Sequence, residues 1–94
     1  MDLSIIVPAY NSAAYIRKCL LSCCNQDIPM LDYELIVVDD GSTDNTKEIV
    51  CNLQKEYSNI KYIYQNNAAQ GAARNNGLRQ ALGKYVWFVD SDDW

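Results

Sequence analysis

The sequence has no histidine, only two prolines and four glycines among its 94 residues, and no long uninterrupted apolar segment. Without histidine, and with Cys19, Cys23 and Cys24 within one helical pattern, a zinc site is not expected. The scarcity of glycine and proline excludes collagen-like chains, and the 49% share of apolar residues excludes intrinsic disorder. No segment reaches the roughly 20 apolar residues that a membrane-spanning helix needs. We therefore expect one small globular domain over residues 1–94.

Positive charge is also scarce, since eight Lys and Arg stand against twelve Asp and Glu, for a net charge of −4. A protein that binds nucleic acid by neutralising phosphates is therefore not expected. Residues 1–4 lack the basic and small-residue features of a secretory signal, so the cytoplasm is the expected compartment. A position at the inner face of the membrane stays open for a full-length protein. In the cytoplasm, the four cysteines are expected to be unpaired and to act as small buried hydrophobic side chains.

The apolar periodicity alternates along the chain between strand-like and helix-like segments. Strands are expected over 3–9, 33–39, 60–64 and 84–89, and helices over 13–24, 46–57 and 71–82. Asn45, three residues before Glu48, is expected to cap the second helix, and Gly83 is expected to end the third. The βαβαβαβ order predicts an α/β fold with a mainly parallel sheet and helices on both faces.

In parallel sheets of this kind, ligands bind beyond the carboxyl ends of the strands. Two of the four expected strand ends are acidic, at Asp39 and at Asp90. Asp90 and Asp92 are one residue apart, so their side chains leave the same face of an extended backbone. Two carboxylates held close together repel each other, which raises the pKa of one of them or recruits a cation. Ligation by oxygen alone favours Mg²⁺ or Mn²⁺. A solvated acidic turn is the alternative interpretation.

Asp39 and Asp40 both end the second expected strand. Because neighbouring strand residues face opposite sides, only one of the two carboxylates should face the ligand edge. A carboxylate at that position can accept a hydrogen bond from N3–H of a uracil base. A helix-capping acid is an equally good interpretation of either residue.

The first strand ends in a tight turn that carries Pro8 and an aromatic ring, Tyr10, which can stack on a base. A tyrosine of the core is the alternative. Arg74 lies early in the third expected helix, where its charge opposes the helix dipole, so it is expected to have an anionic partner. That partner can be Asp40, Asp90 or a ligand phosphate, and a purely structural Arg–Asp pair also stays open.

Four segments together resemble the nucleotide-binding half of family 2 glycosyltransferases, which have the GT-A fold. They are residues 4–11 (SIIVPAYN), 34–44 (ELIVVDDGSTD), 71–77 (GAARNNG) and 85–93 (YVWFVDSDD). The resemblance implies the Rossmann-like half of a GT-A fold and inverting transfer of a sugar from a nucleotide-sugar donor, with a UDP-sugar expected. It also implies site residues: Pro8, Tyr10 and Asp40 at the base, Arg74 nearby, Asp90 towards the ribose, and Asp92 as the main ligand of Mn²⁺ or Mg²⁺.

In this family the general base lies well after the metal motif, in the acceptor-binding half. No residue of this chain matches that role, so the resemblance implies a general base beyond Trp94. It therefore also implies a truncated domain, inactive alone, from an enzyme that acts on a glycan or lipid-linked acceptor in cell-surface polysaccharide or glycoconjugate synthesis. An uncovered sheet edge or apolar face predicts self-association of the chain. The alternative function is a non-catalytic α/β binding or assembly module whose acidic edge is only solvated.

Overall fold

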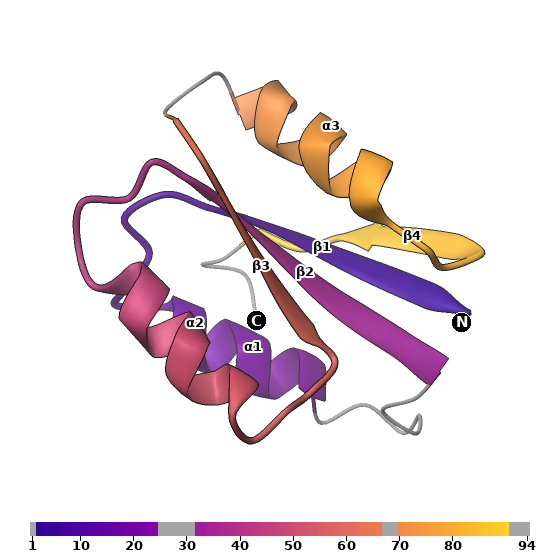
Figure 1. The fold of residues 1–94 in the computed structure, drawn as a ribbon, viewed down its shortest axis with the longest axis horizontal. Helices are drawn as coiled ribbons and strands as arrows, with labels where there is room; N and C mark the ends of the chain where they lie inside the picture. The colour runs from indigo at the N-terminus through magenta and orange to yellow at the C-terminus, as the bar shows by residue number, and fades with distance from the viewer. Residues whose placement is uncertain (1, 25–31, 67–69, 91–94) are drawn as a thin grey trace.

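The computed structural model describes residues 2–24, 32–66 and 70–90, in which strands and helices alternate. Their bounds are β1 Leu3–Ala9, α1 Ile16–Cys24, β2 Tyr33–Asp40, α2 Thr46–Gln54, β3 Ile60–Gln65, α3 Gln70–Gln80 and β4 Tyr85–Phe88. Figure 1 shows the sheet as the middle layer, with α1 and α2 on one side and α3 on the other. The predicted α/β fold with helices on both faces is confirmed.

The sheet has the strand order β3-β2-β1-β4, and all neighbouring strands are parallel. The register pairs Ala9 with Asp39 and Asp40 with Gln65, so β1, β2 and β3 end level with one another. These carboxyl ends lie together at the left of Figure 1. The parallel sheet thus places the ends of these three strands at one edge, as predicted.

The two faces of the sheet carry separate apolar clusters, because successive strand residues point to opposite sides. The larger cluster lies on the side of α1 and α2, and its members include Ile5, Val7, Leu20, Val37 and Leu53. The smaller cluster lies under α3 and joins Ile6, Ile36, Val38 and Ala73. Gly77 allows α3 to lie close to the sheet, because a Cβ there would be only 2.5 Å from Cγ2 of Ile6.

Gly83 does not end α3 as predicted, since the helix ends at Gln80. Its backbone N–H instead donates a hydrogen bond to Oγ of Ser4 at 2.8 Å. A Cβ on Gly83 would lie 2.6 Å from the backbone carbonyl carbon of Leu3. Glycine is therefore needed here because the connection from α3 to β4 passes directly against the backbone of β1.

The four cysteines are unpaired, as predicted. Cys19 and Cys23 are buried in the cluster under α1, whereas Cys24 and Cys51 are only half-buried. The thiol of Cys19 donates to the backbone oxygen of Asp90 at 3.7 Å, so α1 contacts the segment that follows β4. Within the described residues, no helix is long and apolar enough to cross a membrane.

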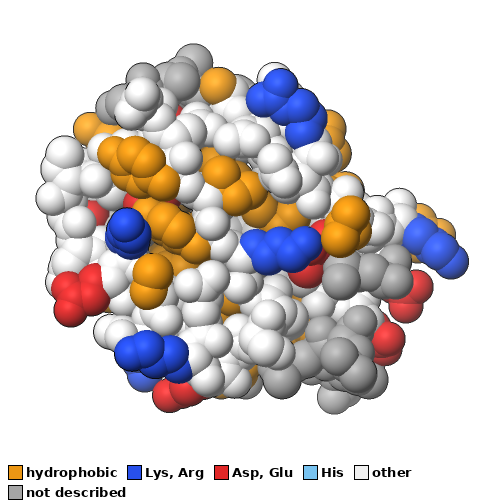
Figure 2. Space-filling view, in the orientation of Figure 1, with side chains coloured by type: hydrophobic (Ala, Val, Ile, Leu, Met, Phe, Trp, Pro, Cys, Tyr) orange, Lys and Arg blue, Asp and Glu red, His pale blue; other side chains and the backbone are white. Residues whose placement is uncertain are grey.

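On the face that Figure 2 shows, the described Lys and Arg side chains are scattered and form no continuous basic patch. Large apolar side chains are exposed around β4, at Leu82, Tyr85, Trp87 and Phe88. In the described sheet β4 is an edge strand, so the backbone groups on its outer side have no neighbouring strand to pair with.

Candidate functional site

The loops after β1 and β2 form one wall of the strand-end edge, and hydrogen bonds join them. The backbone N–H of Asn11 donates to Oγ of Ser42 at 2.9 Å, and the N–H of Thr43 donates to Oδ1 of Asn11 at 2.8 Å. Asn11 and Gly41 have φ angles of 48° and 83°, which asparagine and glycine adopt at lower cost than other residues. The chain itself therefore fixes the shape of this wall.

Asp44 holds the start of α2 and also ties it to the loop after β1. Its Oδ1 accepts hydrogen bonds from the N–H and the hydroxyl of Thr46 at 3.0 and 2.6 Å, and its Oδ2 accepts from the N–H of Ala13 at 3.1 Å. Burial raises the pKa of Asp44, but these hydrogen bonds outweigh it and lower the pKa below its usual value. The predicted capping by Asn45 is wrong, because the Asn45 side chain makes no cap hydrogen bond.

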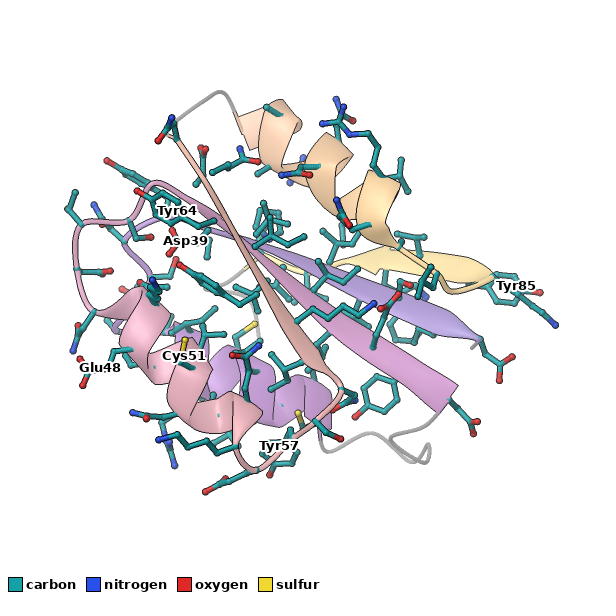
Figure 3. The ribbon with its side chains drawn as sticks, viewed as in Figure 1. Asp39, Glu48, Cys51, Tyr57, Tyr64 and Tyr85 are labelled. Carbon is teal, nitrogen blue, oxygen red and sulfur yellow. The ribbon has the colours of Figure 1, made fainter. Side chains whose placement is uncertain are left out.

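Asp39 and Asp40 face opposite sides of the sheet, as predicted. Asp39 lies on the side of α2, where it accepts from the N–H of Ser42 at 2.9 Å and from the hydroxyl of Tyr62 at 2.5 Å. Burial, together with the hydrogen bond to Asp39, raises the pKa of Tyr62. Figure 3 shows Asp39 below Tyr64, where β2 and β3 end. Asp39 is fully buried and holds the β2–α2 loop, whereas Asp40 lies on the side of α3.

Asp40 is linked to β3 and α3 by two consecutive hydrogen bonds. Nε2 of Gln65 donates to Oδ1 of Asp40 at 2.9 Å, and Nδ2 of Asn76 donates to Oε1 of Gln65 at 2.9 Å. Sequence reasoning missed both amides. The period of β3 could have placed Gln65 on the face of Asp40, but nothing in the sequence shows which residue of α3 lies above it.

Arg74 of α3 forms an ion pair with Asp90, the second residue after β4, with Nη2 and Oδ1 3.3 Å apart. The sequence left Asp40, Asp90 and a ligand phosphate open as the anionic partner of Arg74. In the structure, Asp90 is that partner. The two side chains are 42% and 53% exposed. Exposed pairs of this kind contribute at most about 1 kcal/mol to stability, so this pair can open at little cost when another anion approaches.

Pro8 and Tyr10 lie at the end of β1, which the register places beside the end of β2. Pro8 is buried in a central strand, but β4 pairs with β1 only as far as Ile6, so the N–H that proline lacks interrupts no pairing. Tyr10 is 51% exposed, which rules out a tyrosine of the core.

The predicted metal site is only partly described, because Asp92 lies outside the described residues. Asp90 supplies one carboxylate, a ligand type that suits Mg²⁺ or Mn²⁺, but it is already paired with Arg74. The described part of the chain contains no group of three His, Cys, Asp or Glu side chains that could hold an ion. Trp94 also lies outside the described residues. Metal binding by Asp92 and a general base beyond Trp94 therefore both stay predictions.

The sequence pattern of glycosyl transferase family 2 matches residues 4–94 of the chain. The chain belongs to glycosyl transferase family 2. Over 96 residues, this family 2 chain is 45% identical to a poly(ribitol-phosphate) beta-glucosyltransferase of Bacillus spizizenii, in an alignment that covers 100% of the chain and 15% of the relative. It is also 47% identical over 93 residues to a GalNAc(5)-diNAcBac-PP-undecaprenol beta-1,3-glucosyltransferase of Campylobacter jejuni, covering 97% of the chain and 29% of the relative.

Solved structures of similar proteins have the same fold as this family 2 chain. Staphylococcus aureus TarS, residues 1–349, matches with a TM-score of 0.92 and 44% identity over 100% of the chain and 28% of TarS. The mannosyltransferase PcManGT of Pyrobaculum calidifontis, in complex with GDP-Man and Mn²⁺, matches with a TM-score of 0.92 and 31% identity over 99% of the chain and 28% of that protein. These matches confirm the predicted Rossmann-like part of a GT-A fold. The chain spans less than a third of the length of each of these relatives.

Proposed function

We propose that this chain is the donor-binding portion of a glycosyltransferase, and that its donor is a nucleotide-sugar, with a UDP-sugar expected. The observation that carries the proposal is the strand-end edge, where Asp40 ends β2 and the Arg74–Asp90 pair lies beyond β4. Support comes from TarS, which has been solved in complex with UDP-GlcNAc, and from PcManGT in complex with GDP-Man. The acceptors named for the two curated relatives favour a glycan or lipid-linked acceptor in cell-surface polysaccharide or glycoconjugate synthesis.

The base of the donor would bind between the ends of β1 and β2. There Asp40 would accept a hydrogen bond from the uracil N3–H, a donor that cytosine lacks at this position. The exposed ring of Tyr10 would stack on the base, and Pro8 would line the pocket from β1. The joined loops after β1 and β2 would hold this pocket open, so little conformational entropy would be lost on binding.

The rest of the donor would lie towards α3 and the end of β4. Asp90 would lie near the ribose, and Arg74, whose pair with Asp90 is exposed, would be free to turn towards a phosphate. Asp92 is proposed as the main ligand of Mn²⁺ or Mg²⁺. A cation bound there would neutralise the charge that develops on the leaving diphosphate.

Inverting transfer is the proposed stereochemical course, and it needs a general base that takes the proton from the acceptor hydroxyl. The proposal assigns that role to no residue of this chain and places the base beyond Trp94, in an acceptor-binding half. We therefore expect the 94-residue chain to bind the donor without transferring the sugar.

Calorimetric titration of the chain with UDP, in the presence and absence of Mn²⁺, tests donor binding. We expect UDP to bind, and to bind more tightly in the presence of Mn²⁺. Asp40→Ala should weaken UDP binding at least about tenfold, because a hydrogen bond to a charged group is lost. Asp92→Ala should make UDP binding independent of Mn²⁺. Lys55→Ala is a suitable control, because Lys55 follows the C-terminal end of α2, whereas the strand-end edge lies at the N-terminal end of that helix. Absence of UDP binding by a folded chain would contradict the proposal.

A non-catalytic binding or assembly module is the second candidate. The observation that favours it is that Asp40 already accepts a hydrogen bond within the chain, from Gln65. On this interpretation the acidic edge is only solvated, and UDP should leave the melting temperature of the chain unchanged. A rise that saturates with UDP concentration would exclude this second candidate.

We also propose self-association of the chain and a cytoplasmic position, against the inner face of the membrane for a longer protein that contains this chain. The exposed side chains around the edge strand β4, among them Tyr85 and Trp87, support self-association. Light scattering across a concentration series should show a mass that rises with concentration. A constant monomer mass would contradict it.

A further inference from the structure

We propose that Gln65 and Asn76 are positioning residues that present Asp40 as a hydrogen-bond acceptor to the base of the donor, and so set the preference for uracil. This inference rests on the proposed function. Its observations are the two consecutive hydrogen bonds, each 2.9 Å long, that join Asp40 to Gln65 and Gln65 to Asn76. The three residues come from β2, β3 and α3, so these two hydrogen bonds, called the relay below, connect three elements of the fold.

The polarity of the relay follows from the chemistry of its amides. An amide side chain has one end that donates and one that accepts. Because Oε1 of Gln65 accepts from Nδ2 of Asn76, the NH₂ group of Gln65 is directed at Asp40. If the Gln65 amide were turned over, its oxygen would face the carboxylate and repel it. Asp40 and Asn76 therefore together hold Gln65 in one orientation, and Gln65 in turn positions an acceptor oxygen of Asp40.

The relay matters for recognition because uracil and cytosine differ in the hydrogen-bonding sense of N3. Uracil carries a proton at N3 and needs an acceptor, whereas cytosine has a lone pair there and needs a donor. The NH₂ group of Gln65 donates to Oδ1 of Asp40, so this oxygen is held in place as an acceptor at the position where uracil needs one. Asp40 is only 7% exposed, and in such surroundings an ill-matched polar group costs more than it does in water.

The other charged groups on this side of the sheet that the structure describes are engaged elsewhere or lie at its far end. Glu34 and Lys61 form an ion pair towards the start of β2, and Arg74 pairs with Asp90. Arg79 lies in the last turn of α3. Substitution of Gln65 thus changes a neutral partner of Asp40 without removing either ion pair.

The test is titration of UDP into the Gln65→Glu chain at several pH values in the presence of Mg²⁺, always relative to the wild-type chain at the same pH. Two adjoining carboxylates repel, which raises the pKa of one of them. At about pH 8 we expect UDP affinity to fall at least about tenfold, because the new carboxylate cannot donate to Asp40. Towards about pH 5.5 the new carboxyl group takes up a proton and can donate again, so the affinity should return towards that of the wild-type chain.

Two further variants keep the test specific. Gln54→Glu is the same substitution at a glutamine whose Nε2 donates to the backbone oxygen of Ile60, at the start of β3, and it should leave the pH profile unchanged. Asn76→Leu removes the group that orients Gln65, and it should reduce the preference for UDP over CDP. Melting temperatures of all variants check that each chain is folded.

The outcomes separate this inference from the function on which it rests. If the wild-type chain binds UDP and Asp40→Ala does not, but Gln65→Glu binds as the wild type does at every pH, the relay is overturned and the proposed function stands. If Gln65→Glu is weakened equally at all pH values, Gln65 has only a structural role and the relay is again overturned. If the folded wild-type chain fails to bind UDP, both proposals are overturned.

Discussion

Glu34 and Asp40 lie on the same face of β2, at opposite ends of the strand, and the chain treats their carboxylates differently. Glu34 is 1% exposed and is bound by Nζ of Lys61 at 2.5 Å, by the hydroxyl of Ser4 at 2.6 Å and by the N–H of Leu82 at 2.8 Å. The hydrogen bond that Asp40 accepts from Gln65 comes from a neutral amide. Glu34 is thus anchored by a cation of the chain, whereas a neutral amide positions Asp40, the proposed acceptor for the donor base.

The surroundings of Glu34 explain how a buried carboxylate is tolerated. Burial alone raises the pKa of Glu34, but the hydrogen bonds from Lys61, Ser4 and Leu82 outweigh it and lower the pKa below its usual value. The bond from Leu82 to Glu34 holds the connection from α3 to β4 against β2, and the bond from Gly83 to Ser4 holds it against β1. Figure 3 shows Tyr85, where β4 begins, at the opposite end of the sheet from Asp39.

The largest effect should follow from Glu34→Ala, because it leaves the hydroxyl of Ser4 and the N–H of Leu82 without their acceptor. We expect a loss of about 3 kcal/mol in the free energy of unfolding, measured in urea. Glu48→Ala on α2 is the matched control, since Glu48 is exposed, and should cost no more than about 1 kcal/mol. Equal losses in the two variants would show that Glu34 stabilises the fold no more than an exposed glutamate does.

The same anchor predicts how stability depends on pH. Because folding lowers the pKa of Glu34, its contribution is fully present at neutral pH and is lost as the pH falls below about 4.3, the usual value for glutamate. Glu34→Gln should therefore flatten the loss of stability in acid, as followed by urea unfolding between neutral and acid pH. An acid transition as steep as that of the wild-type chain would contradict this role.

A smaller effect should follow from Gly83→Ala, which tests the close approach at the structural end of the sheet. The added Cβ would lie 2.6 Å from the backbone nitrogen of Ser4, so the α3–β4 connection must shift. We expect a loss of about 2 kcal/mol on thermal or urea unfolding, comparable to other overpacked sites. Leu82→Ala, at a neighbouring exposed side chain, should cost less. The opposite order would show that Gly83 has room for a side chain.

The smallest effect on stability should follow from Arg74→Ala at the ligand end of the sheet. The Arg74–Asp90 pair is exposed on both sides, so its loss should change the free energy of unfolding by at most about 1 kcal/mol. A loss above about 2 kcal/mol would show that the pair stabilises the fold and does not open at little cost.

The sequence allowed the fold to be predicted because apolar runs and helical spacing are local properties. The alternation of apolar runs placed the four strands, and the two-residue period of β2 showed that Asp39 and Asp40 face opposite sides. The contacts that were missed all join distant segments. Neither the Gln65–Asn76 hydrogen bond nor the contact of Gly83 with Ser4 can be read from spacing, because each depends on how α3 lies across the sheet.

We propose that the two ends of β2 have separate roles, one in folding and one in donor binding. The most direct test measures UDP affinity and the free energy of unfolding on the same samples of Asp40→Asn and Glu34→Gln. Asp40→Asn is predicted to lose UDP binding while it stays nearly as stable as the wild type. Glu34→Gln is predicted to lose stability yet to bind UDP normally where it is folded. Undiminished UDP binding by Asp40→Asn would contradict the proposed role of Asp40 in donor binding.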